Sequence, residues 1–115
     1  MRNYNFLAQV YEAKNDTLKS IEYLNKAIAV ADNRLEKFHP ELLHTYKLLA
    51  QQQKKQSKIE KQYESLNRAK EIAIKSYGIT HPNFGYILSD IAEFHKESDP
   101  GNALKLHRQA LNILI

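Results

Sequence analysis

The sequence predicts an all-α protein made of a repeated helix hairpin, and three observations support this prediction. The letters LN(K/R)A at residues 24–27, followed by His39-Pro40, recur 42 residues later at residues 66–69 and at His81-Pro82. Apolar residues recur at intervals of three and four, which is the spacing of one face of an α-helix. The 115 residues include only three glycines and three prolines, which suits helices better than a turn-rich β fold. Self-similarity at a period of this length is typical of stacked supersecondary units.

Three units of about 1–38, 39–80 and 81–115 account for the chain, which we interpret as a single domain. A shift of 42 residues aligns the first helices at Leu7-Ala8, Leu49-Ala50 and Ile91-Ala92. After a one-residue deletion in the third unit, the second helices align at Ala27, Ala69 and Ala110. We therefore expect six helices in three antiparallel hairpins, stacked as a short right-handed α-solenoid.

In the first unit, the first helix is predicted from Arg2 to Ala13 and the second from Thr17 to Lys37. Residues 14–17 form the turn between them. There, Asp16 or Thr17 can cap the second helix by accepting a hydrogen bond from one of its free backbone amides. Each helix carries an apolar stripe that should face the core.

The second unit starts at the first His-Pro pair, because proline at the first helical position gives up no intrahelical hydrogen bond. Its first helix is predicted from Pro40 to Lys54 and its second from Ile59 to Tyr77, with Gly78 in a left-handed C-terminal cap. Residues 51–58 contain no Gly, Pro, Asn or Asp to enforce a turn. A single helix from residue 40 to about residue 77 is therefore the alternative, but the repeat favours a break near Ser57.

The third unit starts at the second His-Pro pair, and its first helix is predicted from Pro82 to about Lys96. Residues 98–101, Ser-Asp-Pro-Gly, give the strongest turn signal in the chain. Asp99 can cap the following helix while Pro100 occupies its first position. The last helix is predicted to run from there to Ile115.

Composition narrows the classes of function. There is no cysteine, which removes disulfides, thiolate catalysis and zinc fingers. No segment reaches the roughly 18 apolar residues that a membrane-spanning helix requires, and the N-terminus has no secretory pattern. The net charge of +4 is too weak to imply nucleic-acid binding by itself. We expect a cytoplasmic protein that does not insert into membranes.

The hairpin pattern resembles the tetratricopeptide repeat (TPR), and the 42-residue period with its His-Pro boundary is most similar to the repeats of kinesin light chain. The resemblance covers nearly the whole chain and implies a scaffold that binds a protein or peptide partner. The second unit departs from the family pattern, because Gln53, Ser57 and Gln62 stand where an aromatic residue, a glycine and an alanine are usual. An Asn-Asn pair precedes the Leu-Ala step in the kinesin light chain type, and only Asn5 matches it.

The resemblance implies that the first helices line a concave groove that binds an extended or helical peptide. Residues that project away from the apolar stripes are the candidates for this peptide-binding groove, and Lys47 lies at its centre. The alternative is that they are only the solvated faces of amphipathic helices. The candidates are Arg2, Asn5, Gln9, Glu12, His44, Lys47, Gln51, Lys54, Tyr86, Ser89, Glu93 and Lys96.

No residues point to catalysis, a metal or a cofactor. The five histidines do not fall at metal-ligand spacing, and there is no phosphate-binding loop, nucleophile elbow or dinucleotide fingerprint. His39 and His81 recur with the repeat, which indicates a role in packing at the unit boundaries. We expect the protein not to be an enzyme.

A lysine cluster, formed by Lys54, Lys55, Lys58 and Lys61, offers an alternative in RNA or phosphate binding. No arginine fork or aromatic stacking platform accompanies it, and a charge run of this kind is normally a solvated turn. Peptide binding is the preferred interpretation.

The last helix is apolar on two sides. Ala103, Leu106, Ala110 and Ile113 can face their own unit, which leaves a second apolar set without an assigned cover. Arrays of repeats normally end in a polar face, because an uncovered stacking surface causes association. We therefore expect either a fragment of a longer array or a structural module that self-associates as a homo-oligomer. The residues expected to mediate self-association are Leu104, Leu111, Leu114 and Ile115.

Overall fold

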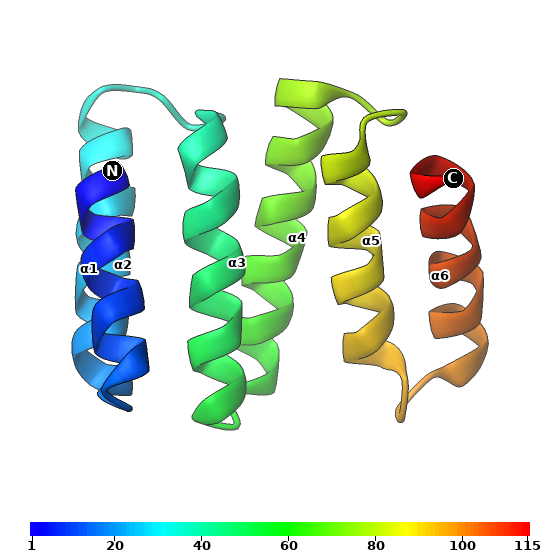
Figure 1. Ribbon diagram of the computed structural model, residues 1–115, viewed down its shortest axis with the longest axis horizontal. Helices are drawn as coiled ribbons and strands as arrows, with labels where there is room; N and C mark the ends of the chain where they lie inside the picture. The colour runs from blue at the N-terminus through cyan, green and yellow to red at the C-terminus, as the bar shows by residue number, and fades with distance from the viewer.

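The computed structural model describes residues 1–115 and contains six α-helices and no strand. The helices are α1 (Arg2–Ala13), α2 (Thr17–Asn33), α3 (Pro40–Lys55), α4 (Ile59–Tyr77), α5 (Pro82–His95) and α6 (Pro100–Leu114). They stand side by side as three antiparallel hairpins (Figure 1), which confirms the predicted fold class. None of these helices combines the length and the apolarity needed to cross a lipid bilayer.

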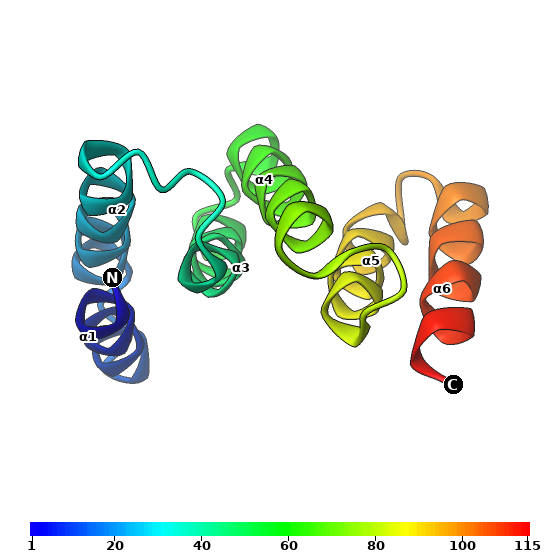
Figure 2. The same ribbon diagram turned by 90° about the horizontal axis from the view of Figure 1, so that it is seen from above.

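The helices form two layers. Seen along the helix axes, α1, α3 and α5 lie on one side, α2 and α4 lie on the other, and α6 stands at the far end beside α5 (Figure 2). Each second helix packs on the first helix of the following unit, as α2 does on α3 and α4 on α5. The first layer is uneven, because the backbone of α3 packs directly against α1 but does not approach α5 as closely.

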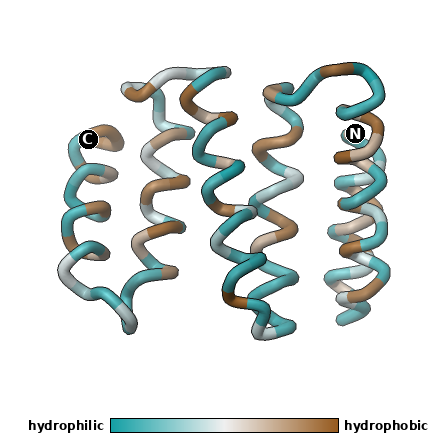
Figure 3. Tube along the Cα trace, turned by 180° about the vertical axis from the view of Figure 1, so that it is seen from behind, coloured by the Kyte–Doolittle hydropathy of each residue, from teal (hydrophilic) through white to brown (hydrophobic).

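Two hydrophobic clusters hold the units together. The larger cluster runs through all three units and includes Ala31, Leu42, Ile72 and Ile87. The smaller one, made of Ala8, Leu24, Leu48 and Leu49, joins the first hairpin to α3. Hydrophobic and hydrophilic residues alternate along every helix, as expected for amphipathic elements (Figure 3). Each large aliphatic side chain that is fully buried contributes about 1.5–3 kcal/mol to the free energy of unfolding.

The helix starts that carry acidic caps follow the sequence prediction. Asp16, rather than Thr17, caps α2, and its Oδ1 accepts a hydrogen bond of 3.1 Å from the Lys19 amide. Asp99 caps α6 in the same way, accepting a 3.2 Å hydrogen bond from the Asn102 amide. Pro100 occupies the first position of α6, as predicted.

The two His-Pro pairs are capping devices, which gives the recurring histidines a more specific role than boundary packing. Nδ1 of His39 accepts a hydrogen bond of 3.1 Å from the Glu41 amide at the start of α3. Nδ1 of His81 accepts one of 3.0 Å from the Asn83 amide at the start of α5. The imidazole thus takes the place that Asp, Ser or Asn usually holds, while the following proline needs no hydrogen-bond partner.

The second hairpin turns where the repeat predicted, and the alternative of one helix across residues 40–77 is wrong. α3 ends at Lys55, and α4 begins at Ile59 after Ser57, whose φ is +58°. The residue one period earlier, Asn15, has a φ of +61° and makes the same turn in the first unit. This backbone requirement explains why a glycine is usual where Ser57 stands.

The end of α2 and the conformation of Gly78 after α4 differ from the prediction, whereas the other helix ends agree to within one residue. α2 ends at Asn33 instead of Lys37, since Leu35 adopts a φ of +56° and stops the helix. Gly78 follows α4 with a φ of +91° but a ψ of 168°, so it lies outside the left-handed helical region that was expected. The segment after α2 is held against α4, where Ser76 Oγ donates a 2.7 Å hydrogen bond to the Phe38 carbonyl oxygen.

One contact inside the hairpins changes its chemistry from unit to unit. In the first hairpin Tyr11 of α1 stacks on Tyr23 of α2, with ring centroids 5.5 Å apart. One period later the same two positions hold Gln53 and Ser65, and Ser65 Oγ donates a 2.7 Å hydrogen bond to Gln53 Oε1. The glutamine that departs from the family pattern is therefore paired inside the hairpin, which removes the cost of burying it.

We expect His39→Ala to destabilise the fold by about 1 kcal/mol, because the Glu41 amide loses its acceptor. His39→Asn keeps a side-chain acceptor at the same position and should cost much less. Urea unfolding followed by circular dichroism distinguishes the two variants. Equal losses would show that the imidazole acts through packing and not as a cap.

Ser57→Gly should stabilise the protein by about 0.5–1 kcal/mol, because glycine adopts a positive φ without the strain that a side chain causes. This net figure already allows for the greater backbone entropy that glycine loses on folding. Ser57→Ala keeps the Cβ and serves as the matched control, with little change expected. Thermal unfolding measures both. A glycine variant less stable than wild type would indicate that the serine side chain stabilises the turn.

Candidate functional site

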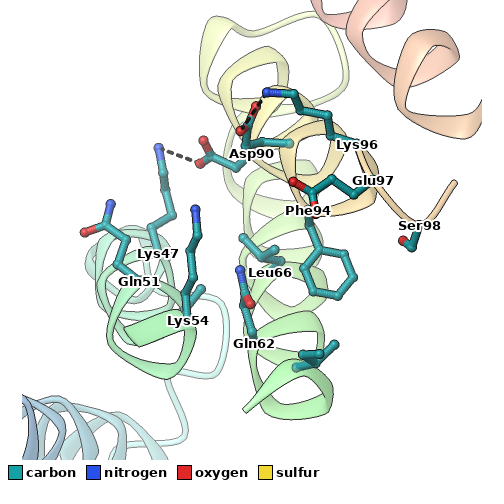
Figure 4. Close-up of a pocket in the computed structure, with 13 residues that line it drawn as sticks. Lys47, Gln51, Lys54, Gln62, Leu66, Asp90, Phe94, Lys96, Glu97 and Ser98 are labelled. Atoms are coloured by element: carbon teal, nitrogen blue, oxygen red, sulfur yellow. Dashed lines mark ion pairs between the residues drawn. The ribbon is translucent and has the colours of Figure 1, made fainter. Parts of the chain in front are cut away.

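A cleft of about 450 Å³ opens between α3, α4 and α5 (Figure 4). It lies where the backbones of α3 and α5 are held apart in the first layer. Side chains from the second and third units line it, and the first unit contributes none. The lining residues are Lys47, Ala50, Gln51, Lys54, Ile59, Gln62, Leu66, Asp90, Glu93, Phe94, Lys96, Glu97 and Ser98.

The wall formed by α3 is basic and amide-bearing. Lys47, Gln51 and Lys54 follow one another at intervals of four and three residues, so they share one face of α3 and extend toward the cleft (Figure 4). Lys54 is exposed and has no ion-pair partner in the protein. Its ammonium group is therefore available to an external acceptor.

The opposite wall comes from α5 and the turn after it, and it is mainly acidic. Asp90, Glu93 and Glu97 lie along it at intervals of three and four residues. Lys96 contributes the one positive charge on this side, and its Nζ lies 3.8 Å from Glu93 Oε1. The cleft thus has walls of opposite charge.

The floor is more apolar and comes largely from α4. Ile59, Gln62 and Leu66 lie on the face of α4 that the two walls leave open. The Phe94 ring of α5 adds to this surface and is fixed by stacking on Tyr63, with ring centroids 5.1 Å apart. Ile59 is largely exposed, so the floor offers apolar surface to a ligand.

One ion pair bridges the two walls. Lys47 Nζ lies 3.5 Å from Asp90 Oδ2, and both side chains are partly buried. Burial raises the pKa of the Asp90 carboxyl above its usual value, and the nearby Lys47 ammonium only partly offsets this effect. Lys47 is therefore a bridge between α3 and α5, and not the freely projecting side chain that the sequence indicated.

The structure brings together five of the predicted groove residues: Lys47, Gln51, Lys54, Glu93 and Lys96. His44, Tyr86 and Ser89, which were expected beside them, do not line the cleft.

Asn5 does not project into a groove, and its expected orientation is wrong. Its side chain is 2% exposed and lies between α1 and α3. Asn5 Nδ2 donates a 3.3 Å hydrogen bond to the Glu41 carbonyl oxygen, and Asn5 Oδ1 accepts one of 2.7 Å from Thr45 Oγ1. Arg2 reaches the same helix, with its Nε 3.5 Å from Glu41 Oε1.

Glu12 is also tied to α3. Its Oε2 accepts a hydrogen bond from Nε2 of Gln52, a side chain that is completely buried. Together with Asn5, this contact joins the two ends of α1 to α3. Gln9 remains exposed, but it lies outside the cleft. The first unit therefore packs closely on the second, and the open part of the surface begins at α3.

Glu93 and Lys96 of the α5 wall were predicted from the sequence, but Asp90, Glu97 and the floor were not. Projecting side chains outward from the Leu-Ala step of each first helix separately does not select the side of α5 that faces back toward α3. Asp90 and Phe94 lie on that side, four residues apart. In the sequence, Asp90 lies three residues before Glu93 and four before Phe94, a spacing that places all three on one side of α5. The direction in which the units stack identifies that side as the one toward α3.

Two further surfaces were predicted from the sequence, the lysine cluster and the outer face of α6. In the lysine cluster, Lys55, Lys58 and Lys61 are exposed but do not line the cleft. On α6, Leu104, Leu111 and Ile115 are exposed, as predicted. Leu114 is a correction, since it packs over Gly85 of α5, where an added Cβ would lie 3.0 Å from Leu114 Cγ. No group of three His, Asp or Glu residues in the structure could hold a metal ion.

The fold is that of TPR-like repeat proteins. BtubC (BKLC) from P. vanneervenii matches 96% of this chain with a TM-score of 0.89 and 19% sequence identity. The "kinesin light chain nearly identical TPR-like repeats" of Podosopora anserina, and a variant of them, each match 97% with a TM-score of 0.80 and 21% identity. This chain spans 44% of the BtubC chain and 54% and 53% of the other two. No family model and no curated protein sequence matches it.

Asp90→Asn should stabilise the protein at neutral pH. A pKa raised by folding means that the folded state binds this proton more tightly, so the ionised carboxylate costs stability above its folded-state pKa. The cost develops as the pH rises from the ordinary value of 3.8 through the raised pKa, and it is absent below both.

Urea unfolding of wild type and Asp90→Asn across this range of pH tests the prediction. The variant should be the more stable protein near neutral pH, and the difference should vanish once the pH falls below 3.8. A variant that is less stable near neutral pH would show that the ion pair with Lys47 outweighs the burial of Asp90.

Proposed function

We propose that this protein is a protein-interaction scaffold that holds a peptide segment of a partner in the cleft between α3 and α5. The TPR-like repeat fold generally mediates protein–protein interactions, which supplies the class of function. The observation that carries the proposal is the cleft itself, with charged walls around a more apolar floor.

The size and lining of the cleft suit part of a polypeptide. Its volume of about 450 Å³ lies within the usual range of about 300–1,000 Å³ for binding pockets. Gln51 and Gln62 each carry an amide donor and an acceptor, which match the backbone groups of a peptide. Ile59, Leu66 and Phe94 can cover an apolar side chain. Recognition would therefore combine backbone hydrogen bonds with one buried anchor.

The cations in the cleft are mostly compensated within the protein, with one clear exception. Lys47 is paired with Asp90, and Lys96 is paired with Glu93. Lys54 alone among the lining cations has no partner. A hydrogen bond between an unpaired ammonium group and a ligand oxygen contributes about 1.5–3 kcal/mol, which makes Lys54 the most informative residue to change.

The position of the cleft follows from unequal spacing of the first helices. Asn5 and Glu12 bind α1 to α3, so no comparable opening forms between the first two units. The backbones of α3 and α5 lie farther apart, and the ion pair of Lys47 with Asp90 spans the opening between them. We place the peptide here, and not along the full concave face that the sequence indicated.

The same residues give little support to catalysis. No histidine lines the cleft, and the only serine there, Ser98, is exposed and has no hydrogen-bonded base. A nucleophile without a base within hydrogen-bond reach lacks the usual means of activation. Binding is therefore the function that the geometry favours.

Site-specific photocrosslinking in a lysate tests the proposal. A photoreactive residue at Gln51, inside the cleft, should capture protein, whereas one at Glu64, exposed on α4 outside it, should not. Adding Lys54→Glu should reduce capture from Gln51 about tenfold, since a charged hydrogen bond is replaced by repulsion. Lys61→Glu makes the same charge change outside the cleft and should leave capture unchanged.

Two outcomes would contradict the proposal. Equal capture from both crosslinking positions would mean that the cleft has no preference for a partner. Capture of nucleic acid, weakened alike by Lys54→Glu and Lys61→Glu and falling steeply with salt, would instead support phosphate binding by the lysine cluster.

A further inference from the structure

The charged side chains of the cleft between α3 and α5 cancel one another. Three cations and three anions line it, so their formal sum is zero. Apart from Lys96, the cations lie on α3, and all the anions lie on the α5 side. A ligand that complements this cleft therefore needs separated charges of both signs, and no net charge. The six residues are Lys47, Lys54, Lys96, Asp90, Glu93 and Glu97.

Four of these six charges are neutralised within the protein. Lys47 Nζ lies 3.5 Å from Asp90 Oδ2, and Lys96 Nζ lies 3.8 Å from Glu93 Oε1. The other two, Lys54 and Glu97, are exposed and take part in no ion pair. The cleft thus retains one free cation on the α3 wall and one free anion on the opposite wall.

The two free charges hold matching places along the cleft. Lys54 lies seven residues after Lys47, and Glu97 lies seven residues after Asp90, in the turn that follows α5. α3 and α5 run in the same direction (Figure 1), so both free charges lie toward the same end of the cleft. Seven residues of α3 span about 10 Å. The walls therefore face each other with opposite charges at two levels, and only the first pair meets.

The opening at the second level has apolar surface below it. Figure 4 shows the Lys54 and Glu97 side chains on opposite sides of the opening. Phe94 and Ile59, which is 66% exposed, belong to the same lining. Gln62 adds an amide that can bond to a peptide backbone. An apolar side chain of a ligand would lie on this surface with a free charge on either side of it.

We propose that the cleft recognises a peptide segment in which an acidic and a basic residue flank an apolar one. The acidic side chain pairs with Lys54, and the basic side chain pairs with Glu97. The apolar side chain lies on Ile59 and Phe94. The inference rests on the proposed peptide binding and adds to it the chemistry of the segment that is bound.

Peptides that carry charges of one sign complement the cleft less well. A wholly acidic segment would satisfy Lys54 but would bring its other charges toward the three carboxylates of the opposite wall. A wholly basic segment would satisfy Glu97 but would bring its other charges toward the ammonium groups on α3. Like charges placed together disfavour a wrong partner. Lys54 and Glu97 therefore act together as the specificity-determining residues of the cleft.

Selection from a displayed library of random heptapeptides, with the whole chain as bait, tests the inference. The enriched peptides should combine an acidic, an apolar and a basic residue. For the best of them, fluorescence polarisation should show that Lys54→Gln and Glu97→Gln each weaken binding about tenfold, because each variant removes one charged hydrogen bond. Lys61→Gln and Glu64→Gln remove the same charges from exposed positions outside the cleft, and they should leave the affinity unchanged.

Matched changes in the peptide assign each contact. When glutamine replaces the acidic residue of the peptide, Lys54→Gln should no longer weaken binding, whereas Glu97→Gln still should. When glutamine replaces the basic residue, the two variants should exchange these results. This double-mutant cycle separates a direct pairing from a general effect of charge. Circular dichroism confirms that each variant remains folded.

The outcomes separate this inference from the peptide-binding proposal. Selected peptides that carry only one sign of charge, or an affinity that Glu97→Gln leaves unchanged, would overturn the inference while peptide binding stands. A library that yields no enriched peptide would contradict peptide binding itself, and the inference would fail with it.

Discussion

The structure depends on close packing between the second helix of each unit and the first helix of the same unit. Ala27, Ala69 and Ala110 occupy the same position in α2, α4 and α6, and all three are buried. A side chain of a single methyl group lets two helix backbones approach, and the larger residues around it then interdigitate. The same small residue is buried once per unit, so each second helix can approach its neighbours closely at the equivalent position. A larger side chain at any of these positions would force the layers apart.

The polar contacts between the first helices decide where the surface is open. Buried polar groups are normally hydrogen-bonded, and the Asn5 side chain and Nε2 of Gln52 find their partners across the contact of α1 with α3, whereas Oε1 of Gln52 has none. Between α3 and α5 the same layer is bridged by the partly buried ion pair of Lys47 with Asp90. The cleft lies where an ion pair, and not amide hydrogen bonds, links neighbouring first helices.

The repeat tolerates changes in chemistry where the geometry of a contact is kept. Tyr11 and Tyr23 are replaced one period later by Gln53 and Ser65, and a stack of rings becomes a hydrogen bond. Ser57 adopts the positive φ for which glycine is favoured, and the turn forms nevertheless. Departures from a family pattern at single positions therefore did not mislead the prediction of the fold, because the period and the apolar spacing are shared by many residues at once.

The sequence alone determined the number of helices, their pairing and most of their ends, because these depend on local spacing, caps and turns that lie within a few residues of one another. For the same reason the sequence identified five of the residues that line the cleft, because each projects from a helix whose apolar face was already assigned. They are Lys47, Gln51, Lys54, Glu93 and Lys96. Only the tertiary structure decided that Asn5 is buried, that Asp90 faces Lys47 and that Leu114 covers Gly85. These outcomes depend on the distance between neighbouring units, and that distance is set by contacts between residues about forty positions apart, which no local pattern encodes.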